Sequence, residues 1–406
     1  FVNLTSVLYL GATALDTIIG SGDGAIFMEC IIGLALFAAA YSLYGGLSAV
    51  AWTDVVQVVL LVIGGLITTY IALEHVSSDG NIFTGMAEVY EQVPEKFSMI
   101  LDKGEIITPN GKDAWWDLPG IAVLVGGLWV ANLYYWGFNQ YIIQRTLAAK
   151  SLKESQRGIV LAGFLKILIP LITVIPGIIA FVMNSDASGM INEGVTSASF
   201  FGENGRIIND NAAPWLIKEF VPAGLKGLVL AALAAAIVSS LASMLNSTAT
   251  IFTMDIYKPF FQEKAGTSEK GLVNVGRVTA SIALVIAIIL APQLKSLGQV
   301  FQYIQEYTGV VSPGILAVFM LGLFWRKTTN NAAIWGVLVS IPIALYFKVG
   351  PNGWSDSPFF ITWPFMHQMM ATWILTMLIM IIISYLETGG KIQEKSITLS
   401  RNLFKT

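Results

Sequence analysis

Ten long apolar stretches constrain the fold of this chain more than any other feature of its sequence. Each is long enough to cross the hydrocarbon core of a bilayer as a helix of about 20 residues. Of the 406 residues, 55% are hydrophobic and only 12% are charged, which is typical of a protein with many membrane spans. Windows of about 19 residues predict spans at 1–19, 25–44, 54–73, 120–141, 158–183, 224–255, 272–291, 300–325, 332–348 and 366–386. We therefore expect an all-α integral membrane protein.

Basic residues predict how these spans are oriented. Lys and Arg concentrate in alternate connections, which are 142–157, 256–278, 326–331 and the tail after 386. The positive-inside rule places these segments, including the C-terminal tail, in the cytoplasm and the acidic 74–118 loop outside. The stretch 224–255 is too long for one crossing, so we expect its helix to extend into the cytoplasm and end near Lys258.

The first residue, Phe1, opens directly on an apolar helix, with no Met, basic region or cleavage signal before it. We expect the chain to be a fragment that lacks N-terminal spans.

Residues that carry catalytic chemistry are scarce. The single cysteine, Cys30, can form no intrachain disulfide, and the two histidines, His75 and His367, fall in or near loops and argue against a His-based metal site. The chain has no glycine-rich phosphate loop, nucleophile elbow or zinc-protease motif. We expect no enzymatic activity.

Lys166 is the most unusual charged residue, because it stands inside the apolar stretch 158–183. A charge near the centre of a bilayer costs at least ~2.5–3.5 kcal/mol, so it is usually retained where it faces a cavity or a substrate path. The alternative is that its stem extends toward the interface near Arg157.

Amides and aromatic rings occur together near the end of the fourth span. On a helix, Asn132, Tyr135, Trp136 and Asn139 share one face. Amides can bind sugar hydroxyls while a ring stacks on the apolar face of the sugar. An aromatic interfacial belt with amides that join helices would give the same pattern.

Two adjacent hydroxyls, Ser239 and Ser240, lie in the sixth span within a run of small residues, 231–243. With free carbonyls of an unwound neighbouring helix they could bind a monovalent cation. Alternatively, the serines bond to their own helix and the alanines serve close helix packing.

The eighth span contains Gly309 and Pro313, which predict a broken helix that lines a cavity. Gln305 would share a face with Phe301, giving a second amide beside a ring. A simple proline kink, with Glu306 at the outer interface, is the alternative.

Asp54 opens the predicted third span. A helix start favours an aspartate electrostatically and Thr53 could cap it, so structure alone could explain the residue. It could equally attract a departing cation.

Several of these motifs, in order, resemble the sodium/solute symporter family, and most closely its bacterial sodium/galactose (glucose) branch. They are Tyr-Gly-Gly-Leu-Ser-Ala at 44–49, Trp-Thr-Asp at 52–54, the run from 132 to 150, the 239–240 serine pair and Gln-Tyr-Ile-Gln at 302–305. A further signature at 322–336 matches less well, because Ala332 and Ser340 stand where glycine is usual.

The resemblance implies a partial leucine-transporter-like inverted-repeat fold with about ten transmembrane helices in this segment. Residues 1–73 would be the last three helices of the first repeat, and 74–119 an external loop. Residues 120–325 would form the five helices of the second repeat, with an external loop at 184–223 and a cytoplasmic loop at 256–271. Residues 326–406 would be peripheral helices and the cytoplasmic tail.

The resemblance also implies roles for individual residues. Asn132, Lys166 and Gln305 would bind sugar hydroxyls, with Tyr135 as the inner gate, Trp136 beside it and Phe301 in an outer lid. Ala236, through its carbonyl, with Ser239 and Ser240 would bind Na⁺, and Asp54 would lie on the sodium exit path.

The function implied is sodium-coupled import of galactose or glucose across the bacterial plasma membrane, with Na⁺ as the co-transported ion. The partners expected are sodium, a hexose and the lipid bilayer, and no nucleic acid. Family members for sialic acid, myo-inositol, proline or pantothenate, or a transporter-like membrane sensor, remain alternatives.

Overall fold

The computed structural model describes residues 2–20, 24–42, 46–108, 111–184, 209–297 and 300–393. Within these residues the chain is mostly helical, with turns and loops between the helices, such as 350–364, and two isolated β-bridges in the 101–119 segment. The α-helices are α1 (Val2–Ile19), α2 (Phe27–Ala40), α3 (Gly46–Val76), α4 (Ile82–Gln92), α5 (Ala122–Val125), α6 (Gly127–Phe138), α7 (Gln140–Leu147), α8 (Leu152–Lys166), α9 (Ile169–Asn184), α10 (Ala212–Phe220), α11 (Ala223–Ile251), α12 (Lys258–Ala265), α13 (Glu269–Leu290), α14 (Val300–Phe324), α15 (Asn330–Val349) and α16 (Phe365–Thr388).

The helical content confirms the all-α prediction. Eight helical stretches among the described residues are long and apolar enough to cross a membrane, and two shorter apolar ones, Phe27–Ala40 and Ala122–Phe138, accompany them. The predicted spans at 1–19, 25–44, 272–291, 332–348 and 366–386 each correspond to a single helix. Of the predicted external loop at 184–223, residues 185–208 lie outside the described residues. The predicted C-terminal tail is described only as far as residue 393.

The predicted fourth span, 120–141, is three helices rather than one. Gly126 separates α5 from α6 with φ −118° and ψ −135°, and Asn139 separates α6 from α7 with an extended backbone, φ −82° and ψ 121°. The prediction that Asn139 shares a helical face with Asn132 is therefore wrong, because α6 ends at Phe138.

The predicted fifth span, 158–183, is also interrupted. α8 ends at Lys166 and α9 begins at Ile169. The physical cause is Pro170, which has no N–H to donate to the carbonyl of Lys166 and whose ring crowds that carbonyl. Lys166 therefore lies at a helix C-terminus, where the helix dipole favours a cation.

Two further predictions about helix ends are wrong. α3 begins at Gly46, so Asp54 lies two turns inside the helix and Thr53 does not cap its start. α14 continues through Pro313 without a break, so the prediction of a broken helix there is wrong. A proline removes one backbone hydrogen bond, and a long helix packed against neighbours tolerates this loss.

The long sixth span extends as predicted. α11 passes through a π-helical turn, Phe252–Tyr257, into α12, which ends at Ala265 with Gly266 as its C-cap. Gly266 has φ +61°, a left-handed conformation that ends helices readily when the residue has no side chain. The predicted extension of this helix past residue 255 is confirmed, but its predicted end near Lys258 is wrong, because the helix continues to Ala265.

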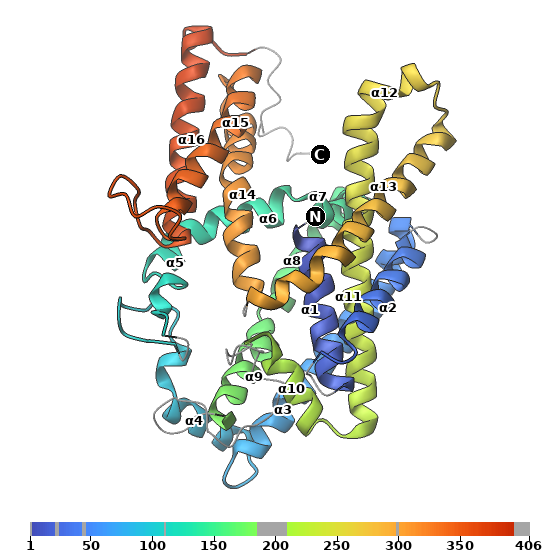
Figure 1. Ribbon diagram of the computed structural model, residues 1–406, viewed down its shortest axis with the longest axis vertical. Coiled ribbons are helices and arrows are strands. Elements are labelled where there is room, and N and C mark those ends of the chain that lie inside the picture. The colour runs from blue at the N-terminus through green and yellow to red at the C-terminus, as the bar shows by residue number, and fades with distance from the viewer. Residues whose placement is uncertain are drawn as a thin grey trace. The chain divides into compact units, whose positions relative to one another are not determined.

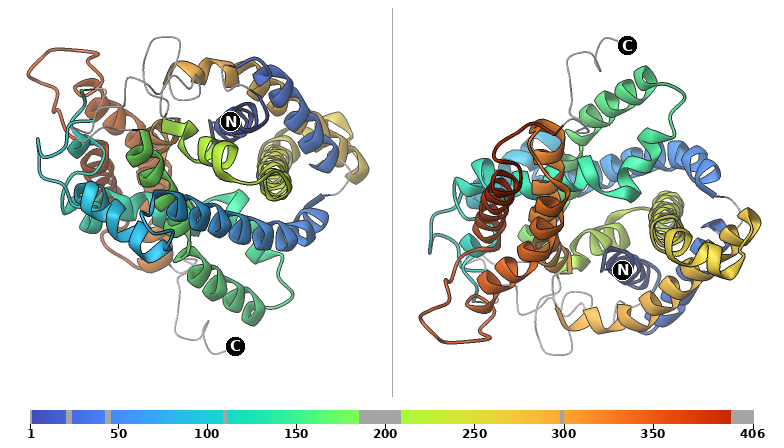
Figure 2. Two further views of the ribbon diagram at one scale, coloured as in Figure 1. Left: turned by 90° about the horizontal axis from the view of Figure 1, so that it is seen from below. Right: turned by 90° about the horizontal axis from the view of Figure 1, so that it is seen from above.

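The chain forms two compact units, which are described separately. The first comprises 1–97 and 144–301, and the second 98–143 and 302–406. In the first unit α11 packs against α1, α2, α3 and α13 (Figure 1), and Figure 2 shows α11 nearly end-on beside α1. In the second unit α15 and α16 lie side by side, and α6 packs against α16.

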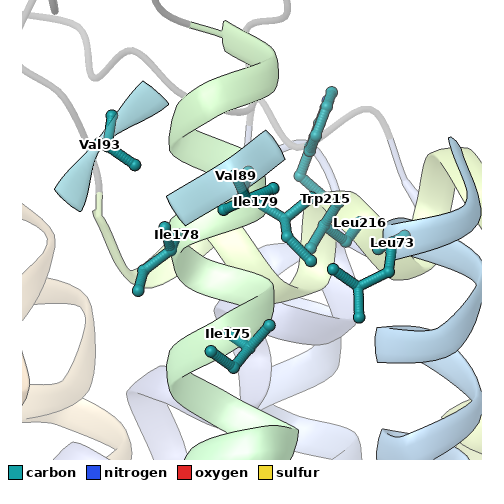
Figure 3. Packing of buried hydrophobic residues seen from close by; sticks show 10 residues of the cluster. Leu73, Val89, Val93, Ile175, Ile178, Ile179, Trp215 and Leu216 are labelled. Carbon is teal, nitrogen blue, oxygen red and sulfur yellow. The ribbon is translucent and has the colours of Figure 1, made fainter. Parts of the chain in front are cut away.

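A hydrophobic core in the first unit joins α3, α4, α9 and α10. Figure 3 shows side chains from these four helices and from the turn after α4 converging on Ile179, which is fully buried. The cluster consists of Ala72, Leu73, Val89, Val93, Ile175, Ile178, Ile179, Ala180, Trp215 and Leu216. This packing anchors the C-terminal end of α3. The other half of the same helix carries Asp54 beside α11.

Candidate functional site

An ionic network in the first unit surrounds Asp54 of α3. Its Oδ2 accepts a hydrogen bond from Nε of Arg145 at 2.9 Å and lies 2.8 Å from Nη2 of the same guanidinium. Its Oδ1 accepts a hydrogen bond from Oγ of Ser239, on α11. Three residues that are far apart in the sequence therefore meet at one carboxylate, and each carboxylate oxygen has a partner.

Ser243 completes this network one turn further along α11. Arg145 Nη2 donates to its Oγ at 2.6 Å, and that hydroxyl donates to the carbonyl of Ser239 at 2.9 Å. Gln144 Nε2 donates to the backbone carbonyl of Ser243 at 3.2 Å. We call Asp54, Arg145, Ser239 and Ser243 the Asp54 network.

The local sequence explains why these groups can meet. Ser239 and Ser243 are four residues apart and lie above one another on α11. Glycines on α3 allow the two helices to approach, since a Cβ at Gly64 would lie 3.2 Å from Val229 of α11. The planar guanidinium of Arg145 can donate to a carboxylate and to a hydroxyl at once.

The electrostatics of the network are balanced. One carboxylate faces one guanidinium, and their side chains are 22% and 31% exposed, so both charges are only partly desolvated. Besides this ion pair, the network contains the hydroxyls of Ser239 and Ser243 and the backbone carbonyl of Ser239. A small cation near Asp54 would compete with Arg145 for the carboxylate, so sodium and the guanidinium are expected to exclude each other there.

The other predicted sodium residues lie beside this network on α11. Ser239 is buried, whereas Ser240 and Ala236 are half-buried. Ala236 and Ser240 are four residues apart and so lie on one face of the helix. Their hydroxyl and carbonyl oxygens are ligands that suit a hard cation. Among the described residues there is no group of three or more His, Cys, Asp or Glu side chains that could hold a metal ion.

The predicted sugar residues on α6 lie in the second unit. Nδ2 of Asn132 donates to the Leu128 carbonyl at 3.0 Å, so its amide currently bonds to its own helix. The hydroxyl of Tyr135 hydrogen-bonds that of Tyr141, and its ring packs edge-on against Trp136 with centroids 5.1 Å apart. Trp136 is half-exposed, so an aromatic surface is available beside the amide.

On α14, Gln305 is half-buried in the second unit. The side chain of Phe301 lies outside the described residues. Gln302, one turn before Gln305, donates from Nε2 to Oδ1 of Asp117 at 2.9 Å. A segment of the 98–120 loop is thus tied to the start of α14.

Lys166 belongs to the first unit, where it is exposed at the break between α8 and α9. Asn132, Tyr135, Trp136 and Gln305 belong to the second unit. The assignment of these five residues to one sugar site therefore stays a prediction.

Two residues of the Asp54 network were missed by the sequence reasoning. In the sequence, Arg145 is only one of the basic residues of 142–157 that predict the cytoplasmic side. Ser243 was grouped with the small residues of 231–243. The four-residue spacing of Ser243 from Ser239 was visible in the sequence, whereas the partner of Arg145 lies 91 residues away and left no local signal.

The comparisons with known proteins identify the family. The family model described as "Sodium:solute symporter family" matches residues 1–340. The chain belongs to this family of transporters. The sodium/glucose cotransporter of Vibrio parahaemolyticus is 53% identical over 406 residues, which are 100% of this chain and 70% of the relative. Sodium/myo-inositol cotransporter 2 of Homo sapiens is 33% identical over 79% of this chain, which spans 49% of that relative.

A solved structure shares the fold. A Na⁺-coupled sialic acid symporter in a substrate-bound, outward-open state superposes with a TM-score of 0.68 at 22% identity, covering 95% of this chain and 71% of the other. The predicted leucine-transporter-like fold is thereby confirmed. This symporter family chain is a multi-pass membrane transporter and not an enzyme, and Na⁺ is the co-transported ion of its family.

Proposed function

We propose that this chain carries sodium-binding and sugar-binding residues of a symporter that imports galactose or glucose by alternating access. The observation that carries the proposal is the Asp54 network, in which a carboxylate at the start of a candidate membrane span contacts the predicted sodium-binding serine, Ser239. Intramembrane carboxylates are expensive and usually mark an ion path.

Sodium would bind through Ser239, Ser240 and the carbonyl of Ala236, with oxygens from elsewhere in the protein completing the shell. On its way out the ion would approach Asp54. Arg145 would then be displaced from the carboxylate and would return when sodium leaves, which favours release in one direction.

The sugar would be held by amides and rings. Asn132 and Gln305 offer paired donors and acceptors, Tyr135 and Trp136 offer flat apolar faces, and the ammonium of Lys166 can donate to a hydroxyl. The sodium/glucose cotransporter of Vibrio, 53% identical, supports a hexose as the substrate.

We assign the helices to repeats as follows. Residues 1–73 would close the first inverted repeat, 120–325 would form the second, and 326–406 would be peripheral. Sodium binding would stabilise the outward-open arrangement and sugar binding would permit occlusion. Loss of sodium to the cytoplasm would then release the gate at Tyr135, with the C-terminal tail on the cytoplasmic side.

The test is uptake of labelled galactose into proteoliposomes that contain the purified protein. An inward sodium gradient should drive accumulation, potassium in its place should not, and unlabelled glucose should compete. If sodium drives no solute into the vesicles, the symport mechanism is wrong.

A second candidate substrate class follows from other relatives. Sodium/myo-inositol cotransporter 2 of Homo sapiens and the bovine sodium/mannose cotransporter are 33% and 32% identical to this chain. All of these named solutes are polyhydroxylated rings. Competition of galactose uptake by mannose, myo-inositol and sialic acid would rank them, and sodium-driven uptake of one of these without galactose uptake would replace the hexose assignment.

A further inference from the structure

A second ion pair, between a buried lysine and a partly exposed glutamate, lies in the second unit. Lys348 is in the last turn of α15, and its side chain is only 4% exposed. Its Nζ lies 3.0 Å from Oε2 of Glu306 on α14 and 4.5 Å from the ring centroid of the next residue, Tyr307. The ammonium thus has a carboxylate and an aromatic face as partners.

This arrangement compensates for burying the charge of Lys348. The C-terminal end of a helix favours a cation, and the face of a ring adds a further attraction. A small cavity beside the pair is lined by Gly309 of α14 and by Gln368, Met369 and Thr372 of α16. Three helices therefore meet at Lys348, and the pair joins α15 to α14 where α16 packs on them.

The position of Glu306 on α14 gives the pair its functional interest. Glu306 directly follows Gln305, the proposed sugar ligand, and lies four residues after Gln302, on the same side of the helix. Gln302 is tied to Asp117, which also accepts a hydrogen bond from Lys112 at 2.6 Å. Two polar contacts, one on each side of Gln305 in the sequence, thus fix the two turns that carry it.

We propose that Lys348 and Glu306 are positioning residues that hold the first half of α14 in the orientation in which Gln305 can bind the sugar, with the Gln302–Asp117 contact as a second tie. The expected effect on sugar transport rests on the proposed function, in which Gln305 binds the sugar. A merely structural pair would support α15 without affecting how Gln305 is presented.

Single and double substitutions separate the two roles. Replacing one partner of a buried pair leaves the other charge uncompensated, whereas replacing both with uncharged groups of similar shape removes that penalty. Glu306→Gln and Lys348→Met should each raise the KM for galactose about tenfold at saturating sodium, which is the effect of one lost hydrogen-bonded orientation. The maximal rate and the half-saturating sodium concentration should stay within about twofold, and the double variant should recover part of the sugar affinity.

The matched control is Glu154→Gln, which removes an exposed ion pair with Arg157 on α8. It should change neither sugar KM nor protein yield. If Glu306→Gln and Lys348→Met lower thermal stability but leave the sugar KM of the inserted protein at the wild-type value, the pair is structural and the proposal is wrong.

A second measurement reports the position of residue 305 without requiring transport. The chain has one cysteine, Cys30, so a Cys30→Ser background accepts a reporter through Gln305→Cys. The rate at which a polar maleimide labels this reporter should change at least about fivefold on adding Lys348→Met or Asp117→Asn, and not on adding Glu154→Gln. An unchanged rate would overturn the positioning role, whereas changed labelling in a protein that imports no sugar would retain it and reject the proposed substrate.

Discussion

At the scale of single residues, the chemistry of this chain concentrates where a charge or hydroxyl inside the membrane has found a partner. Asp54 is the clearest case, because its two carboxylate oxygens are divided between Arg145 and Ser239. Leaving this partly buried carboxylate unpaired would be unfavourable, and the guanidinium offsets that cost. In the proposed mechanism, sodium would compete with this guanidinium for the carboxylate.

Asp54→Asn should therefore change the sodium dependence of uptake more than it changes the stability of the fold. The amide keeps the shape of the side chain and can still bond Ser239, but it loses the ion pair and the attraction for a cation. We expect the half-saturating sodium concentration for uptake to rise about tenfold, which corresponds to ~1.4 kcal/mol. Sodium titration of galactose uptake measures it, and an unchanged sodium curve would remove Asp54 from the ion path.

Lys166 presents a different case at the same scale, because it is exposed at a helix break. Lys166→Ala should weaken sugar binding by about 1.5–3 kcal/mol, the value of a hydrogen bond that involves a charged group, while the protein still inserts. The measurement is galactose affinity by equilibrium binding at saturating sodium. Undiminished affinity would favour the alternative that the side chain extends toward the interface.

At the scale of helices, the breaks and close approaches are decided by particular glycines and prolines. Gly127, the first residue of α6, packs against the start of α16, and a Cβ there would lie 1.9 Å from the backbone oxygen of Met366. Gly137, near the other end of the same helix, has no atom within 4 Å of such a Cβ. The two glycines form a matched pair for testing how closely α6 must pack.

Gly127→Ala should lower the stability of the protein, because the methyl group collides with a backbone atom that cannot rotate away. Overpacking of this kind costs typically ~1–3 kcal/mol. Gly137→Ala should be neutral or stabilise by up to ~1 kcal/mol, since alanine is the better helix former. Thermal unfolding in detergent compares them, and equal melting temperatures would mean that α6 and α16 separate easily.

The start of α14 is capped from outside the helix. Asp210, in a short 3-10 turn at Asn209–Asn211, accepts a hydrogen bond from the N–H of Val300 at 2.9 Å. Burial raises the pKa of Asp210, and the hydrogen bond from Val300 offsets only part of this shift. An acid with a raised folded-state pKa binds its proton more tightly when folded, so stability falls as pH rises from the ordinary carboxyl range through the raised pKa.

Asp210→Asn should abolish that part of the pH dependence. The amide oxygen can still accept from Val300, but no charge is buried at any pH. We expect melting temperature to change less with pH in the variant than in the wild type over the weakly acidic range. A wild-type protein that gains stability as pH rises through this range, by a step that the variant lacks, would contradict the sign of the shift.

At the scale of the whole molecule, the proposed function requires that the binding of sodium and the binding of sugar be coupled. The Asp54 network lies in the first unit, and most of the proposed sugar residues lie in the second. Symport requires only that each ligand bind better when the other is present. A coupling free energy of ~1–3 kcal/mol suffices, and it is the same for either order of binding.

Titration calorimetry can measure both orders. Saturating sodium should tighten galactose binding about 5- to 150-fold, and saturating galactose should tighten sodium binding by the same factor. Potassium, added at the same concentration, controls for ionic strength. Independent binding of the two ligands would show that the protein is not a symporter for galactose.

The sequence by itself determined that the chain is a multi-pass membrane protein, and the order of its motifs determined its family. Both follow from features that are local in the chain: apolar length, and short runs such as 302–305. Lys166 and the serine pair at 239–240 were also visible because a polar residue inside an apolar stretch needs no partner to be noticed. The single spans predicted at 120–141 and 158–183 were wrong, because averaged hydropathy does not detect a break made by one glycine or proline.

Only the tertiary structure decided which polar groups meet. Asp54 finds Arg145 across 91 residues and Ser239 across 185, and Lys348 finds Glu306 across 42. Pairings of this kind have no periodicity, since they depend on which helices pack together and at what register. Hydropathy measures the cost of moving each residue from water into lipid, whereas the partner that offsets the cost is supplied by the fold.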